Sequence, residues 1–159
     1  MALEPKSALR LQFIARVVGK ECRHLITTDQ RLFGDLLTLE QVSRLEEDPD
    51  LAERVEAFVS RFGRLQDSVG DKLLPLLLTA LGEKSSAAID NLDRAERLGL
   101  LQSADEWMTM RNLRNQMVHE YVEDPVILSS ALQTGHNFAP ALIATANKMI
   151  TEIEKRGWV

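Results

Sequence analysis

Apolar residues recur every three or four positions along most of the chain, which is the spacing of one face of an α-helix. The longest such run lies between residues 49 and 82 and comprises Leu51, Val55, Phe58, Val59, Phe62, Leu65, Val69, Leu73 and Leu77. A continuous stripe of this kind predicts a long helix with one buried face. Pro75 lies inside the run and is expected to kink or split the helix, because proline lacks an N–H and its ring collides with the preceding turn.

Capping residues mark where further helices begin. The Asp-Pro pairs at 48–49 and 124–125 each combine an N-cap residue with a proline at the first helical position. Thr38 and Ser103, each with Gln or Glu three residues later, match the capping-box pattern. These signals predict a short acidic helix from residue 38, the long helix from 49, a helix over about 103–122 and a helical region over about 125–156.

Interruptions are expected in two places. The first helical stripe covers residues 6–28, and residues 27–29 with Gly34 have the composition of a loop. In the C-terminal region Gly135 and Pro140 are expected to break the helix into two pieces, because both residues disfavour a helix interior.

The remaining boundaries complete the predicted architecture. Gly82 and Gly99 are expected to end helices, and a helix is expected to start at Ser85 or Ser86 between them. The order of elements predicts an all-α helical bundle of about five to six helices with a long kinked central helix. No linker or repeat divides the chain, so one domain over residues 1–159 is expected.

Composition narrows the class of protein. The 159 residues are 45% hydrophobic and 27% charged, which is ordinary for a globular protein. A single cysteine excludes an internal disulfide. No apolar run approaches the length of a membrane span, and the N-terminus lacks the pattern of a signal peptide. We therefore expect a cytoplasmic protein that does not enter a membrane.

The net charge of the chain limits which binding partners are expected. The formal charge is -5, which argues against indiscriminate binding of duplex nucleic acid. Basic residues nevertheless gather locally, as at Arg94, Arg97, Arg111 and Arg114. The three histidines are far apart in sequence, and no paired His or Cys motif is present, so no metal site and no cofactor is expected.

The segment over 103–122 holds the most informative residues. At about 100° per residue, Arg114 falls inside the apolar arc of this helix. That arc is formed by Trp107, Met110, Leu113, Met117, Val118 and Tyr121. A guanidinium in such a position needs a carboxylate partner or an anionic ligand. Arg111, Asn115 and His119 follow one another at intervals of four along a polar edge of the same helix.

Arg114 and His119 together suit chemistry on a phosphodiester. Arginine binds phosphate oxygens with two N–H groups at once, and a histidine near neutrality moves protons. The two residues project about 140° apart on the helix, so two copies of the chain are expected to share one cleft. The alternative interpretation is structural: Arg114 pairs with Asp67 or Asp71 on a neighbouring helix, and His119 is a surface residue at a helix end.

Residues 114–121 match the R-x4-H-x-Y signature with Arg114, His119 and Tyr121, and Asn115 supplies the polar residue that commonly follows the arginine. This segment resembles the HEPN proteins, and specifically their HepT-like branch. Residues 61–67, continued by 70–75, resemble the same family upstream. The two segments cover about a quarter of the chain in the expected order.

The resemblance implies a homodimeric, metal-independent endoribonuclease that is the toxin of a toxin–antitoxin pair. It implies that Arg114 binds the scissile phosphate of an RNA substrate, that His119 is the general acid/base, and that Asn115 orients the substrate or the histidine. Tyr121 is the position that a partner nucleotidyltransferase, the MNT antitoxin, modifies by adenylylation. Asp67 or Gln66 is implied as a supporting polar group from the opposite helix.

Two other functions stay open at this point. HEPN-like proteins also include non-catalytic substrate-binding or adaptor partners of nucleotidyltransferases, in which Tyr121 would be modified without nuclease activity. The chain is alternatively a helical interaction module in which Arg114 is one member of a buried ion pair.

Overall fold

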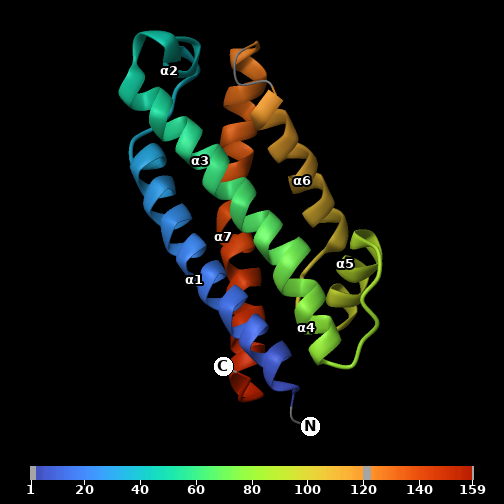
Figure 1. Cartoon of the computed structure of the whole chain (residues 1–159). Helices are drawn as coiled ribbons and strands as arrows, with labels where there is room; N and C mark the ends of the chain where they lie inside the picture. Colours follow the sequence, from blue (N-terminus) through green and yellow to red (C-terminus); the bar gives the residue numbers. More distant parts are fainter. Residues whose placement is uncertain (1–2, 120–122, 159) are drawn as a thin grey trace.

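The computed structural model describes residues 3–119 and 123–158, which form helices and no strand (Figure 1). In chain order the elements are α1 (Pro5–Phe33), α2 (Leu39–Ser43), the 3-10 turn η1 (Leu45–Glu47), α3 (Pro49–Asp67), the π-helical segment η2 (Ser68–Leu73), α4 (Leu74–Ala80), α5 (Ala88–Arg97), α6 (Ala104–His119) and α7 (Pro125–Lys155). The predicted all-α bundle is confirmed. No helix within the described part of the chain is long and apolar enough to cross a membrane.

The predicted capping residues start the helices as expected. The Thr38 hydroxyl accepts from the Gln41 N–H at 3.2 Å, and the Gln41 side chain accepts from the Thr38 N–H at 3.0 Å. Asp48 caps α3 through the Leu51 N–H, and Asp124 caps α7 in the same manner. Ser103 Oγ accepts from the Glu106 N–H at 3.1 Å, before the first turn of α6. Each cap satisfies an N–H that the helix cannot pair internally.

The long central helix is continuous from α3 through η2 to α4. Its adjustment to Pro75 lies one turn earlier, where the Leu74 N–H donates to the Val69 carbonyl five residues back. This wider π-helical turn makes room for the proline ring and absorbs the missing hydrogen bond. The helix is therefore not split at Pro75, and the irregularity that the proline was expected to cause is the π-helical segment one turn earlier.

Two predicted interruptions are wrong. Helix α1 continues through residues 27–29, where Thr27 Oγ1 bonds back to the Arg23 carbonyl at 3.0 Å and the buried Thr28 hydroxyl accepts a hydrogen bond from Arg61 of α3. Helix α7 continues through Gly135 and Pro140. A Cβ at Gly135 would lie 3.3 Å from Phe58, so this glycine serves close packing and does not end a helix.

The start of α5 is also later than predicted. The side chain of Asn91, which is buried, accepts from the Ser86 N–H at 2.9 Å and donates to the Ser86 carbonyl at 3.2 Å. These bonds hold the preceding loop against α5, and the helix begins at Ala88 instead of at Ser85 or Ser86.

Helix α3 lies between α1 and α6, with α7 behind it (Figure 1). Buried side chains from all of these helices form one cluster that includes Phe58, Phe62 and Leu142. Trp158, beyond the end of α7, is buried as well, and its carbonyl accepts from Gln12 of α1 at 2.7 Å. This arrangement gives α3 two long sides, one toward α1 and one toward α6.

Candidate functional site

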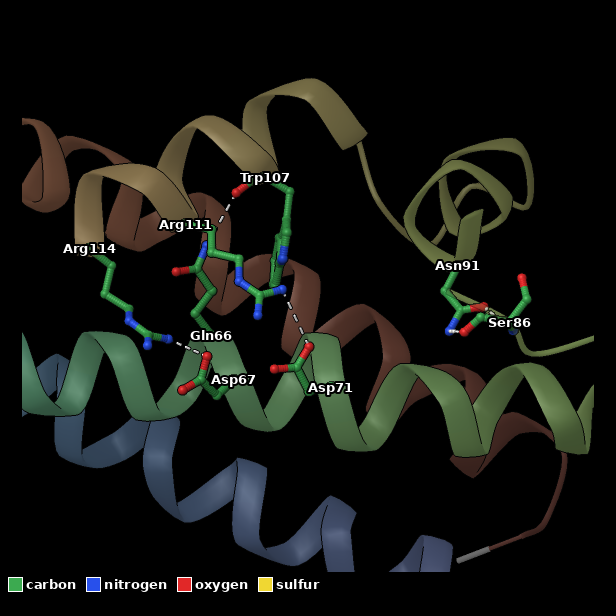
Figure 2. A network of polar contacts seen from close by, with 8 residues as sticks. All are labelled: Gln66, Asp67, Asp71, Ser86, Asn91, Trp107, Arg111 and Arg114. Atoms are coloured by element: carbon green, nitrogen blue, oxygen red, sulfur yellow. Dashed lines mark hydrogen bonds and ion pairs between the residues drawn. The ribbon is translucent and has the colours of Figure 1, made fainter. Parts of the chain in front are cut away.

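Arg114 of α6 contacts Asp67 of α3 directly. Its Nη1 donates to Asp67 Oδ1, and the two side chains are 24% and 43% exposed (Figure 2). This contact is the one that the alternative, structural interpretation predicts, in which Arg114 pairs with Asp67 or Asp71 on a neighbouring helix. The pair is partly open to solvent, so it is neither a surface ion pair nor a fully buried one.

Two glycines of the central helix allow α6 to approach closely. A Cβ at Gly63 would lie 2.9 Å from Cδ of Arg114, and a Cβ at Gly70 would lie 3.2 Å from the indole nitrogen of Trp107. Gly63 and Gly70 are seven residues apart, as are Trp107 and Arg114, so the two helices run antiparallel in a repeated register. The buried Trp107 ring occupies the space beside the π-helical turn.

Further polar contacts extend the same line. Arg111 Nη1 lies 3.6 Å from Asp71 Oδ1, and Gln66 Nε2 donates to the Trp107 carbonyl at 3.3 Å (Figure 2). Gln66 is 2% exposed, and its Oε1 has no hydrogen-bond partner among the residues described. We call this contact line the α3–α6 seam; it comprises Gly63, Gln66, Asp67, Gly70 and Asp71 opposite Trp107, Arg111 and Arg114.

The seam balances its charges. Each of its arginines lies opposite one aspartate, so the four groups together carry no net charge. A guanidinium has more N–H donors than one carboxylate oxygen uses. Arg114 therefore keeps N–H donors on its exposed side. The site can use these donors to bind a second anion.

Asn115 and His119 lie near the same end of α6 as Arg114. Asn115 follows Arg114 and is exposed. His119 is the last residue of α6, about 7.5 Å further along the helix axis than Arg114. Tyr121 lies outside the described residues. Val118, expected within the apolar arc, is 53% exposed, which corrects that expectation.

One polar cluster was not anticipated. His136 Nδ1 of α7 lies 2.7 Å from Asp29 Oδ1 of α1, and the ring of Phe33 stacks on the imidazole with centroids 4.1 Å apart. No local pattern predicts this cluster, because the contact requires α1 to continue past residues 27–29. Within the part of the chain that the structure describes, no three His, Cys, Asp or Glu side chains gather as metal ligands.

The only cysteine is not a nucleophile at neutral pH. Burial raises the pKa of the Cys22 thiol to about 11, and the nearby Glu21 carboxylate adds to this effect while Arg23 opposes it. The thiol therefore stays protonated, and the thiolate is the reactive form.

Comparison of the chain with models of protein families, with curated proteins and with solved structures finds no match. The expected resemblance to HEPN proteins therefore rests on the two sequence segments alone, and the structure brings Arg114 of one segment into contact with Asp67 of the other.

Proposed function

We propose that the chain is a HEPN-like endoribonuclease of the HepT type, which cleaves RNA without a metal ion. The observation that supports this best is the contact between Arg114 and Asp67. It joins the R-x4-H-x-Y segment to the upstream segment that resembles the same family, although the two are 47 residues apart. The all-α fold agrees with this proposal.

In the proposed reaction a ribose 2′-oxygen attacks the adjacent phosphorus, and the bond from phosphorus to the 5′-oxygen breaks. His119 accepts the proton of the 2′-hydroxyl and returns a proton to the leaving 5′-oxygen. The free N–H groups of Arg114 bind the non-bridging oxygens, where charge grows in the transition state. Asn115 orients the substrate or the histidine, and the products end in a 2′,3′-cyclic phosphate and a 5′-hydroxyl.

The same proposal covers assembly and control. A homodimer in which two copies of α6 share a cleft would supply Arg114 and His119 to one RNA from both sides. Adenylylation of Tyr121 by an MNT-type nucleotidyltransferase antitoxin would add a negatively charged phosphodiester seven residues along the chain from Arg114. That group would compete with RNA for Arg114 and silence the toxin. We propose that the toxin and its antitoxin act in the cytoplasm.

One observation favours a second candidate, a non-catalytic adaptor or interaction module. The charge of Arg114 is already met by Asp67, as expected of a structural ion pair. In that case Arg114 holds α6 against α3, and the protein acts only as a partner of a nucleotidyltransferase.

The test uses wild type, His119→Ala and the matched control His24→Ala, which removes an exposed histidine of α1. Each purified protein is incubated with single-stranded RNA in excess chelator, and each is also expressed in growing cells. We expect cleavage and growth arrest from wild type and His24→Ala, and a rate about 10²–10⁴-fold lower for His119→Ala.

Equal rates for wild type and His119→Ala would contradict the proposal. No cleavage by a wild-type protein whose intact mass shows no added nucleotide would contradict it as well, and would favour the adaptor.

A further inference from the structure

The side of α3 that faces α1 carries a polar cavity of about 380 Å³. It is lined by Thr28 and Arg31 of α1 and by Asp50, Glu53, Arg54, Ala57 and Arg61 of α3. We call it the arginine cavity. Its volume lies in the range of about 300–1,000 Å³ that is typical of small-molecule sites.

Helical spacing explains how the cavity forms. Arg54, Ala57 and Arg61 follow one another at intervals of three and four, which places them on one side of α3. Ala57 has no side chain beyond Cβ, so it leaves space between the two arginines. Arg61 reaches α1 while Gly63, two residues later, meets α6. The cavity and the α3–α6 seam therefore lie on opposite sides of α3.

The arginines of the cavity carry charge that no carboxylate neutralises closely. Arg31, Arg54 and Arg61 form no ion pair with another residue that the structure describes. Arg61 is half-buried and is held by two neutral acceptors, the Thr28 hydroxyl and the His24 carbonyl. A guanidinium that is desolvated and fixed in this manner gains from binding an anion.

A second cavity has a similar composition, but its arginine at the centre is paired with a carboxylate. The cavity between Lys84 and Arg97 also combines basic residues with aspartates. There, however, Arg94 lies 3.8 Å from Glu83 and donates to the Lys84 carbonyl. Its central arginine is thus already paired with a carboxylate of the chain, whereas Arg61 is not.

We propose that the arginine cavity binds a sugar phosphate, either free or as part of a nucleotide. The guanidinium groups of Arg31, Arg54 and Arg61 bind the phosphate, whose oxygens match the planar fork of arginine. Asp50 and Glu53 are exposed members of the same lining, and they repel a bare anion but accept hydrogen bonds from sugar hydroxyls. This site lies on the opposite side of α3 from Arg114 and does not depend on the nuclease proposal.

The test is calorimetric titration of the full chain with ribose 5-phosphate, AMP, inorganic phosphate and ribose at low ionic strength. We expect saturable binding of ribose 5-phosphate that is about tenfold tighter than that of inorganic phosphate, because the hydroxyls add hydrogen bonds to charged acceptors. Ribose is not expected to bind. Tighter binding of AMP than of ribose 5-phosphate would assign the ligand as a nucleotide, and equal binding would assign a free sugar phosphate.

Variants locate the site. The side chains of Arg31 and Arg54 form no hydrogen bond or ion pair with another described residue, so Arg31→Gln and Arg54→Gln should leave the fold intact. Each is expected to weaken binding of ribose 5-phosphate about tenfold. The matched control Arg64→Gln removes an exposed arginine of α3 that does not line the cavity, and it should bind as wild type does.

Absence of binding by ribose 5-phosphate would overturn the proposal. Equal affinity of wild type and Arg54→Gln would overturn it too. Inorganic phosphate that binds as tightly as ribose 5-phosphate would overturn the assignment to a sugar phosphate.

Discussion

Arginine side chains lie on both sides of α3, and the two sides differ in whether a carboxylate neutralises the arginine charge. Toward α6, Arg114 and Arg111 lie opposite Asp67 and Asp71. Toward α1, Arg61 has only neutral acceptors, and a cavity lies beside it. An arginine paired within the chain holds two helices together and offers only its spare donors to a ligand. An arginine without a carboxylate partner keeps its charge for a ligand, even where neutral acceptors hold its side chain as they hold Arg61.

The two sides of α3 also differ in how closely the neighbouring helix packs against them. On the α6 side, glycines bring Trp107 and Arg114 into close contact with the central helix, so little space remains. On the α1 side, Ala57 lies between Arg54 and Arg61, and these residues line a cavity together with residues of α1. The difference predicts that substitutions in the seam change stability, whereas substitution of Arg31 or Arg54 in the arginine cavity changes binding.

Trp107→Ala should have the largest effect on stability. The Trp107 side chain is 3% exposed and packs on Gly70, so its removal leaves a cavity in the seam. We expect the free energy of unfolding to fall by about 3–5 kcal/mol. Urea denaturation measures this, with Trp107→Phe as the milder control. A loss below about 1 kcal/mol would show that the seam is not closely packed.

Asp67→Asn and Asp71→Asn compare the two ion pairs of the seam. Asp67 contacts a guanidinium that is 24% exposed, whereas the Arg111–Asp71 pair is looser, at 3.6 Å, and more exposed on the arginine side. We expect losses of about 1 kcal/mol for Asp67→Asn and of at most about 0.5 kcal/mol for Asp71→Asn. Chemical denaturation of both variants decides the order, and the reverse order would contradict the assignment of the tighter pair.

Gly63→Ala tests whether the Arg114–Asp67 ion pair depends on the space that Gly63 leaves for Arg114. The new methyl group displaces the Arg114 side chain, while alanine gains about 1 kcal/mol of helix propensity over glycine. The net change in stability should stay within about 1 kcal/mol. In this background Asp67→Asn should cost nothing more, because the ion pair is already broken. A double-mutant cycle measures that coupling, and fully additive losses would refute the mechanism.

Arg54→Gln should have the smallest effect on stability. Arg54 has no ion-pair partner within the described part of the chain, so we expect a change within about 0.5 kcal/mol. Thermal unfolding without added phosphate measures it. A loss as large as that of Asp67→Asn would remove the distinction between the two sides of α3.

Local signals in the sequence identified most helix starts, because a cap needs only residues close to it in the chain. They misplaced interruptions whose outcome depends on distant partners. Gly135 contacts Phe58, and Thr28 is bonded to Arg61, and neither contact can be read from local composition. Helix α7 passes through Pro140 because a long packed helix tolerates the loss of one hydrogen bond.

The candidate sites likewise differ in whether local sequence patterns or contacts between distant residues determine them. The place of Arg114 within an apolar arc predicts either a carboxylate partner or an anionic ligand, and it does not distinguish Asp67 from Asp71 as the partner. The arginine cavity was not foreseen, since it depends on the register between α1 and α3 and on the small side chain of Ala57. Periodicity identifies which side of a helix is buried, but not what lies opposite each residue.

The most direct test of the account is the end group left on RNA by the purified protein in excess chelator. We predict a 2′,3′-cyclic phosphate from wild type and from His24→Ala, and about 10²–10⁴-fold less of it from His119→Ala. Cleavage that needs a metal ion, or that proceeds equally without His119, would contradict the central claim.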